Sequence, residues 1–391
     1  MVHLGHWSLD GARYRRLMPG PLNGVRVIEL GGIGPVPHAG MVLADLGAEV
    51  IEVVRPGAAL DIRDVLRRGK KSVAVDLKSP EGVAAVLRLV AGSHVLIEGF
   101  RPGVAERLGV GPDECFAANP RLVYGRMTGW GQQGPLADRA GHDIDYIAVS
   151  GVLSSVGPQG HPYPPLNLVG DFGGGSMLLL VGVLAALRHA EQTGEGQVID
   201  AAMVDGSALL MAMHHGAVAA GWWTGRRGEE LFDGSAPFYT TYRTADDEWV
   251  AVGALEPQFF QELVEGLGLD LADLPAQMDR EGWPEMRRVF AERFAQRTRA
   301  EWEEHFAGSD ACVVGVYSMT EAPRHPHLVD RGTFVEVDGV IQPAPSPRFS
   351  ATPAGPPGPI PAPGEHTSEV FTSGPTGEGR GGYSAQPGER S

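Results

Sequence analysis

Residues 25–54 read VRVIELGGIGPVPHAGMVLADLGAEVIEVV, and this stretch decides the fold class. An apolar run over 25–30 is followed by the glycines of GGIGP, by a helical pattern through LADLG, and by a second apolar run that ends at residue 54. The order predicts a strand, a turn, a helix and a strand, and SVAVDL, EGVAAVLRLVAG and HVLIEGF repeat it over 72–100. Such alternation indicates an α/β protein with a parallel sheet covered by helices.

The pattern changes further along the chain and predicts a second, smaller α/β domain. Residues 178–190 read as a helix, and 198–223 read as a second long helical segment. From about residue 230, PFYTTYRTADDEWVAVGAL predicts an antiparallel hairpin, and 257–268 and 284–306 predict amphipathic helices. We therefore divide the chain into an N-terminal extension (1–17), a large domain with linker helices (18–228 and 325–371), a small α/β domain (229–324) and a disordered tail (372–391).

The composition excludes several classes of protein. With 32 Lys and Arg against 48 Asp and Glu, the formal net charge is −16, whereas binding to nucleic acid needs a basic surface. Cys115 and Cys312 stand in no metal-ligand spacing, which indicates neither a disulfide framework nor a metal site. The N-terminus lacks a secretory signal pattern, and the apolar stretch 177–187 suits a buried helix better than a membrane span. We expect a cytoplasmic protein with neither nucleic acid nor a membrane as partner.

The first glycine loop raises the question of a nucleotide. It begins as GxGxxG but has Pro37 where the third glycine belongs, which weakens a dinucleotide interpretation and leaves a simple tight turn as an equal alternative. The second strand is followed by Arg55 rather than by an acid that would hold a ribose. Lys70, Lys71 and Arg101 add cations at the ends of later elements, and each alone is typical of a solvated surface charge. Together they predict an anion site at the carboxyl ends of parallel strands.

Two segments contain candidates for acid–base chemistry. GHDIDYIAVSG places His142 directly before a predicted helix, where Asp143 or Asp145 would cap it, and histidine is the side chain that titrates nearest neutrality. GDFGGGSM places Asp171 ahead of three glycines and a helix start. There a substrate carbonyl could approach the backbone, and helix amides could stabilise an enolate oxygen. Burial would raise the pKa of Asp171 and the helix dipole would lower it. For each residue alone, a structural or capping role is the more common one.

These motifs together resemble those of the family III CoA-transferases, and within that family those of the α-methylacyl-CoA racemases. The resemblance covers roughly residues 20–371, through PLNGVRVIELGGIGP, LGAEVIEVVRP, RGKKSVAVDLKS, EGFRPGVAERLG, MTGWGQQGP, AGHDIDY, PPLNLVGDFGGGSM, GEGQVIDAAMVDGS, LEPQFF and GEHTSEVF. It implies a large domain with a Rossmann-like sheet, a small α/β domain, and a homodimer whose two chains interlock, with the active site between subunits.

The resemblance also assigns roles to individual residues. It implies that CoA is held partly by Arg55 and Arg101, and we count Lys70, Lys71 and Asp143 among the candidate CoA-binding residues. The acyl group is expected near His142 and Asp171, with Glu256 of LEPQFF close to the histidine; an acid before a proline is also a common helix cap.

The family contains two kinds of enzyme, CoA-transferases and racemases, and the sequence has to be assigned to one of them. In the transferases, the aspartate that matches Asp171 is a nucleophile that moves CoA between carboxylic acids. The racemases add a histidine that matches His142 and an acid that matches Glu256, and this chain has both. A racemase needs two groups of opposite protonation state on the two faces of an enolate. We therefore predict a 2-methylacyl-CoA racemase that uses His142 and Asp171 and needs no cofactor, in lipid or related metabolism. The alternatives are a CoA-transferase and a catalytically silent CoA-binding protein.

One position departs from the pattern of the racemases. They commonly read GHDINY where this chain has Asp145, which adds a negative charge one helical turn from His142. We expect this change to bear on substrate preference.

Overall fold

The computed structural model describes residues 20–59 and 64–372, so the predicted extension over 1–17 and residues 373–391 of the predicted tail lie outside the described residues. The chain divides into two compact units. We call residues 20–127 (without 60–63), 179–200 and 345–372 the sheet unit, and residues 128–178 and 201–344 the mixed unit. The boundaries predicted between a large and a small domain stay predictions.

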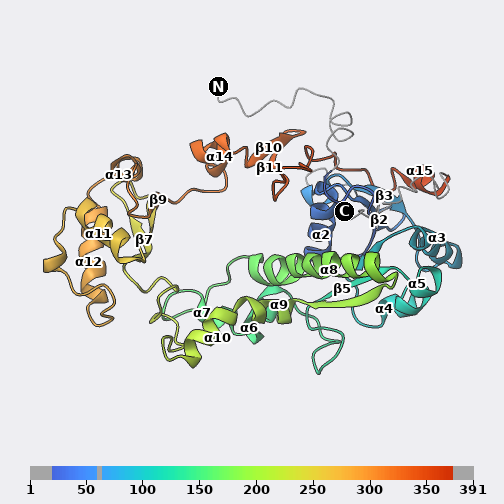
Figure 1. The fold of residues 1–391 in the computed structure, drawn as a ribbon, viewed down its shortest axis with the longest axis horizontal. Helices are drawn as coiled ribbons and strands as arrows, with labels where there is room; N and C mark the ends of the chain where they lie inside the picture. Colours follow the sequence, from blue (N-terminus) through green and yellow to red (C-terminus); the bar gives the residue numbers. More distant parts are fainter. Residues whose placement is uncertain (1–19, 60–63, 373–391) are drawn as a thin grey trace, which may run out of the picture. The chain divides into compact units, whose positions relative to one another are not determined.

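A six-stranded sheet with the order β3-β2-β1-β4-β5-β6 forms the centre of the sheet unit (Figure 1). Its strands are β1 Arg26–Leu30, β2 Glu49–Val54, β3 Lys71–Ala74, β4 Val95–Glu98, β5 Val123–Thr128 and β6 Gln197–Ala202. The pairs β1–β2, β2–β3, β1–β4 and β4–β5 are parallel. This is the strand order of a Rossmann sheet, and the predicted α/β class is confirmed.

The helices of the sheet unit begin where the sequence provides start signals. Helix α2 (Pro35–Asp45) has a proline at its first position, directly after Gly34, whose φ of 72° favours glycine. Helix α3 (Pro80–Ala91) begins after Ser79, whose hydroxyl accepts a hydrogen bond from the Gly82 N–H at 3.0 Å. Apolar residues of β1–β5 share one buried core with α3, α4 (Val104–Arg107) and α5 (Pro112–Ala118). The remaining elements are η1 (Val65–Arg67), α8 (Leu178–Thr193) and α15 (Thr367–Thr372).

The segment after α8 differs from the prediction. The helix predicted over 178–190 is confirmed, but the single long helix predicted over 198–223 is wrong. Residues 197–202 form β6, the edge strand next to β5, and the helices α9 (Met203–Leu210) and α10 (Ala212–Ala219) follow. Sheet pairing overrides the local helical pattern because strand preference depends strongly on the neighbouring strand.

The apolar run noted at 177–187 lies within a longer helical stretch. Residues Leu168–Thr193 are long and apolar enough to cross a membrane by length and composition, a test that core helices of soluble proteins also pass. Within α8, Leu179, Val183 and Leu187 are buried, and a Cβ added at Gly125 of β5 would lie 2.9 Å from the Leu179 side chain. Such close packing on the sheet is typical of a core helix.

The mixed unit contains the predicted hairpin and helices. The hairpin β7–β8 is confirmed and is extended by β9 in the antiparallel order β7-β8-β9. Residues 284–306 form two helices rather than one. The second helix begins after Thr298, whose hydroxyl accepts a hydrogen bond from the Glu301 N–H. Phe238, Phe260 and Phe290 lie in the fully packed core between sheet and helices. The elements are α6 Asp143–Val149, α7 Val152–Ser155, η2 Leu168–Met177, α9, α10, β7 Tyr239–Arg243, β8 Trp249–Gly253, α11 Pro257–Gly266, η3 Leu271–Asp273, α12 Trp283–Phe294, α13 Arg299–Phe306, β9 Val313–Gly315, η4 Ala322–Arg324, α14 Pro326–Asp330, β10 Phe334–Val337 and β11 Val340–Pro343.

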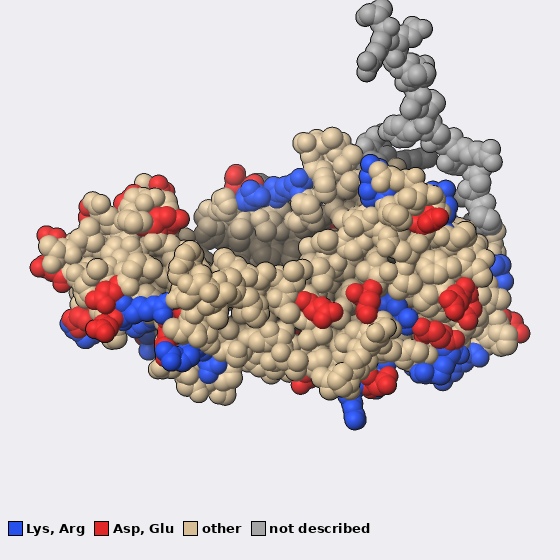
Figure 2. Space-filling view, turned by 60° about the horizontal axis from the view of Figure 1, so that its bottom comes forward, with Lys and Arg blue, Asp and Glu red and all other residues tan. Residues whose placement is uncertain are grey.

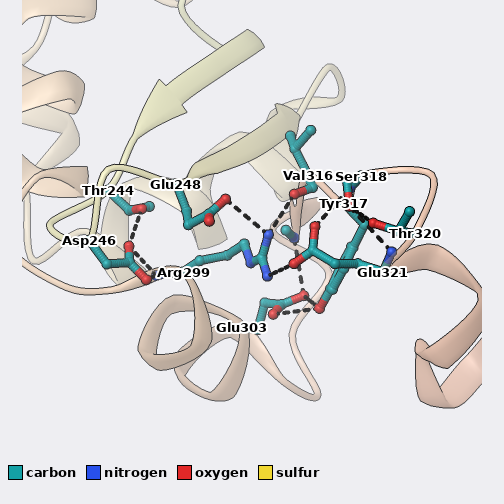
Figure 3. A network of polar contacts seen from close by, with 11 residues as sticks. Thr244, Asp246, Glu248, Arg299, Glu303, Val316, Tyr317, Ser318, Thr320 and Glu321 are labelled. Carbon is teal, nitrogen blue, oxygen red and sulfur yellow. Dashed lines mark hydrogen bonds and ion pairs between the residues drawn. The ribbon is translucent and has the colours of Figure 1, made fainter.

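A polar network fixes the point where the chain leaves the three-stranded sheet (Figure 3). The guanidinium of Arg299 donates to Glu248 Oε2 at 3.2 Å, to the Val316 carbonyl at 2.8 Å and to Glu321 Oε1 at 2.8 Å. It also lies 4.6 Å from the centre of the Tyr317 ring. The hydrogen bond from Arg299 lowers the pKa of Glu321 to about 2. One arginine thus joins the β7–β8 turn, α13 and the segment after β9.

The negative net charge does not gather in one place on the face shown in Figure 2. Acidic and basic side chains are interspersed there, and wide areas between them have neither. The face shown has no broad basic surface of the kind that nucleic-acid binding requires.

Candidate active site

His142 stands at the start of α6, as the sequence predicts. Its N–H donates to Asp145 Oδ2 at 2.9 Å, so the aspartate that departs from the racemase pattern anchors the histidine backbone. Behind it, the rings of Trp130 and Tyr146 pack edge to face with centroids 4.8 Å apart, and the Tyr146 hydroxyl donates to the Gly141 carbonyl. The His142 side chain itself is exposed. The backbone is therefore held from two sides while the imidazole stays accessible.

Asp171 lies inside a helical segment. Asp171 precedes α8, as predicted, but the π-helical stretch η2 begins at Leu168 and already contains Asp171 and the three glycines. The segment has wider turns than an α-helix, a geometry found frequently at functional sites. Asn167 Nδ2 donates to Asp171 Oδ2 at 3.0 Å, a contact that the sequence analysis missed although the spacing of four residues is a helical one.

The electrostatics of Asp171 answer the question left open by the sequence. Burial raises the pKa of Asp171, the hydrogen bond from Asn167 opposes this, Asp143 adds to the rise and the charge of His142 lowers it. Burial prevails, so the pKa lies above that of an ordinary aspartate.

Asp143 connects the two segments that hold these side chains. Its Oδ2 accepts a hydrogen bond from the Asp171 N–H at 2.8 Å, and its side chain is buried. A Cβ added at Gly170 would lie 2.6 Å from the same oxygen, so only glycine fits there. Asp143 Oδ1 is buried without a hydrogen-bond partner among the described residues. The predicted contact of Asp143 with CoA stays a prediction, and its position ties α6 to η2.

The glycines around Asp171 serve internal packing. A Cβ added at Gly206 of α9 would lie 1.8 Å from the Gly174 carbonyl oxygen, and one at Gly174 would lie 2.5 Å from the Ser207 nitrogen. Two backbones therefore meet here with no space for side chains. The expectation that the three glycines after Asp171 admit a substrate carbonyl stays a prediction, and Gly174 is the one whose missing side chain is explained by packing against α9.

Glu256 does not meet the other two catalytic candidates in this chain. It is exposed and stands at the N-cap position of α11, but its side chain makes no capping hydrogen bond. No hydrogen bond or ion pair joins it to His142 or Asp171 within residues 20–59 and 64–372. Its charge acts instead on Cys312, whose pKa is raised by burial first and by Glu256 second.

Two of the predicted cations lie at the edge of the sheet where ligands bind. Arg55 directly follows β2, Arg101 follows β4, and both side chains are exposed. Between these strands lies β1 with its glycine loop, and the strand order reverses between β1 and β4. Open α/β sheets bind ligands at this reversal, outside the carboxyl ends of their strands.

The other two predicted cations are elsewhere. Lys70 and Lys71 come at the beginning of β3, so their expected place at the carboxyl ends of strands is wrong. Lys70 Nζ is buried and donates to both oxygens of Glu29, at 2.7 and 2.8 Å. Lys71 Nζ pairs with Glu49 at 2.9 Å and with Glu369 at 2.7 Å. Each lysine is therefore committed to acidic partners of its own chain, and the structure does not bring either to the Arg55–Arg101 edge.

Comparison with known proteins places this arrangement in a family. The sequence profile of CoA-transferase family III matches residues 22–367. The α-methylacyl-CoA racemase of Mus musculus is 49% identical over 354 residues, which are 90% of this chain and 92% of the relative. The succinyl-CoA–D-citramalate CoA-transferase of Chloroflexus aurantiacus is 33% identical and is covered over 94% of its length, against 90% of this chain. The crystal structure of a CaiB/BaiF family protein from Brucella suis has a TM-score of 0.78 and 25% identity, covering 90% of this chain and 99% of that one. The chain belongs to CoA-transferase family III.

Proposed function

We propose that this chain is an isomerase that racemises 2-methylacyl-CoA thioesters. The observation that carries the proposal is the hydrogen bond from the Asp171 N–H to Asp143, the residue after His142, because it joins the segments that hold the two proposed catalytic side chains. Identity of 49% to a mouse protein named α-methylacyl-CoA racemase supports it. The transferases of the family supply the second candidate, since Asp171 alone would fit their nucleophile.

The proposed reaction moves one proton in and one proton out. One of the two groups takes the α-proton, the C–H electron pair becomes part of the enolate, and the other group delivers a proton to the opposite face of Cα. In the reverse direction His142 and Asp171 exchange these roles. The raised pKa of Asp171 suits this exchange, because it makes the carboxylate a stronger base.

The thioester does the work that a cofactor would otherwise do. It acidifies Cα by delocalising the carbanion onto the carbonyl oxygen, so we propose that the reaction needs neither a metal nor pyridoxal phosphate. We assign Arg55 and Arg101 to the phosphates of CoA, because both are exposed cations at the ligand-binding edge of the sheet.

We propose further that two copies of this chain form a homodimer. No residue of α10 is buried, and Met213 and Val218 are 62% and 47% exposed. Leu209 and Leu210 of α9 are 60% and 52% exposed, and Trp222 after α10 is 79% exposed. A run of apolar side chains of this size is typical of a protein interface. A second chain could also supply an acid such as Glu256, which no hydrogen bond or ion pair joins to His142 within the described residues of one chain.

The two cysteines bear on the cellular compartment. We propose the cytoplasm, because Cys115 and Cys312 are both free thiols and neither is placed to form a disulfide. A membrane partner is not proposed, since the long apolar helix packs on the sheet through α8.

The deciding experiment is proton exchange in D2O. One enantiomer of a 2-methylacyl-CoA is incubated with the protein, and α-deuterium and the ratio of enantiomers are followed together. We expect deuterium at Cα and formation of the opposite enantiomer. His142→Ala and Asp171→Asn should each lower the rate by a factor of about 10² to 10⁴, the usual contribution of a general acid or base. The matched control is His189→Ala, an exposed histidine of α8, which should leave the rate unchanged.

The same assay separates the alternatives. Label that moves from the thioester to a free carboxylic acid, with no effect of His142→Ala, would establish the transferase instead. Binding of CoA with neither exchange nor transfer would establish a silent binding protein. Absence of exchange across short, branched and long acyl chains would refute the racemase.

A further inference from the structure

Glu98, the last residue of β4, is a buried acid that the proposed reaction does not use. Its side chain is 0% exposed, and both of its oxygens are occupied. Oε2 accepts a hydrogen bond from the Phe100 N–H at 2.6 Å, and Oε1 accepts one from Arg126 Nε at 3.1 Å. The carboxylate therefore anchors, by a hydrogen bond, the backbone of the loop that begins directly after it.

Arg126 connects Glu98 to the residues at the other end of the loop. It lies opposite Glu98 in the parallel pairing of β4 with β5. Its two terminal nitrogens donate to Glu106 Oε1 at 2.8 Å and Oε2 at 3.2 Å, and Glu106 belongs to the short helix α4. The chain Glu98–Arg126–Glu106, which we call the loop bracket, joins the residues before and after the loop 99–103. Arg101 stands in the middle of that loop.

The opposite side of the loop is fixed against the first glycine loop. A Cβ added at Gly31 would lie 2.5 Å from the Phe100 ring, and one added at Gly99 would lie 3.0 Å from the Gly32 Cα. The two loops therefore touch at the reversal of strand order between β1 and β4. With the loop bracket on one side and the glycines on the other, the loop has little freedom to move.

Burying a charged bracket at this place is costly and needs a purpose. Burial raises the pKa of Glu98 to about 7, against the Phe100 amide and Arg126, which both favour the charged form. An apolar pair of the same size would stabilise the sheet at least as well, because buried ion pairs barely recover their desolvation. What an apolar pair would not do is hold a backbone N–H in a set direction. That function suits a loop whose geometry matters to a ligand.

We propose that Glu98 is a positioning residue for CoA, which acts through the Phe100 amide and Arg126 to hold the 99–103 loop so that Arg101 meets the phosphates of the nucleotide portion. This rests on the proposed function only in taking CoA as the ligand. Glu98 itself touches no substrate. Its effect is therefore confined to binding of the phosphate-bearing end and leaves the chemistry at Cα alone.

The test measures CoA binding and turnover separately. Glu98→Ala should weaken CoA binding, measured by calorimetry without turnover, by about tenfold, the size expected when one charge-assisted contact is misaligned. KM for the acyl-CoA should rise in parallel while kcat stays within about twofold. KM for the corresponding acyl-pantetheine thioester, which has no nucleotide phosphates, should not change. A general loss of structure would affect both substrates.

A double variant shows whether Glu98 acts through Arg101. In an Arg101→Ala background, Glu98→Ala should add nothing to the loss of CoA affinity, because the contact that it positions is already gone. Additive losses would overturn the proposal. So would an unchanged CoA affinity in Glu98→Ala, or an equal penalty with the pantetheine thioester.

A milder change covers the case in which Glu98→Ala does not fold. Glu106→Gln removes charge from the half-exposed end of the loop bracket, where side-chain exposure is 43%, and leaves the buried acid in place. It should weaken CoA binding in the same substrate-dependent way but less, and wild-type affinity in a folded Glu106→Gln protein would count against the bracket. Wild-type protein that binds no CoA would refute the proposed function as well. Wild-type binding with unaffected variants would refute only the role of Glu98.

Discussion

Replacing Lys70 by methionine tests whether this lysine belongs to the protein core or to an anion site. In the structure its ammonium is buried, pairs with Glu29 and also donates to the Pro37 carbonyl at 3.0 Å. Methionine keeps the buried chain of methylenes and removes only the charge. We therefore expect a loss of stability that depends on pH, together with CoA affinity close to that of the wild type.

The size of the pH effect follows from Glu29. Burial raises the pKa of Glu29 from 4.5 to about 7 even though Lys70 lowers it, so removing Lys70 raises this pKa further. A group whose pKa is raised by folding loses its stabilising effect as the pH climbs through the folded-state value. In the wild type, the fall in unfolding free energy caused by ionisation of Glu29 ends near pH 7. In Lys70→Met, the same fall continues to higher pH. The gap in unfolding free energy between the two proteins should widen by about 1.4 kcal/mol per pH unit above pH 7, or about 3 kcal/mol by pH 9.

The assay is urea unfolding at pH 6, 7.5 and 9, with the difference from the wild type taken at each pH. Glu29→Gln combined with Lys70→Met should abolish the widening, because no carboxyl group is left to titrate. Lys78→Met, at an exposed lysine of the same unit, should stay within about 0.5 kcal/mol of the wild type at every pH. A gap that is equal at pH 6 and pH 9 would refute this account of Glu29. A loss of CoA affinity in Lys70→Met as large as that in Arg101→Ala would show that Lys70 takes part in binding CoA.

Two further predictions concern the surroundings of Asp171. Asn167→Ala removes a hydrogen bond that lowers the pKa of Asp171. For the reaction direction in which Asp171 removes the proton, the acid limb of the pH profile of kcat/KM should therefore move to higher pH. An unmoved limb would show that this carboxylate is not the titrating base. Gly206→Ala drives a methyl group into the Gly174 carbonyl, which should cost about 1–3 kcal/mol in urea unfolding and reduce kcat by displacing the Asp171 segment. The control is Gly160→Ala, at a loop glycine outside α9 and α10 where an added Cβ meets no atom within 4 Å; it should be neutral or stabilising, so equal losses in both variants would contradict the packing argument.

The parts of the fold that could be predicted from the sequence are those fixed by neighbouring residues. The alternation of strands and helices over 25–100 is local, and so are Pro35 after the glycine loop and the Ser79 cap. Strand β6 was missed because its pairing with β5 outweighs a pattern that continues smoothly into α9. Local order likewise could not reveal that Asp171 lies inside a π-helical segment, since this depends on the packing of that segment against α9.

The run RRGKK shows why charges were harder to predict than strands. In sequence it resembles a basic surface, but three of its cations are buried against acids of other elements. Arg67 pairs with Glu52, Arg68 with Asp45 and Lys70 with Glu29, and their side chains are at most 9% exposed. The acids stand 15 to 41 residues earlier, so no local spacing links them to the run. Arg55 and Arg101 were placed correctly because their position depends only on which strand they follow.

Asp143 contributes to both the geometry and the acidity of the proposed site. By accepting the Asp171 N–H, it fixes η2 against α6, the helix that begins after His142. Burial is the main cause of the raised pKa of Asp171, and the negative charge of Asp143 adds to the rise. A neutral side chain of the same shape could keep the first effect and would lose the second. The proposed exchange of roles uses both effects, because the segments that hold the two groups must be fixed together and because a raised pKa makes Asp171 a stronger base.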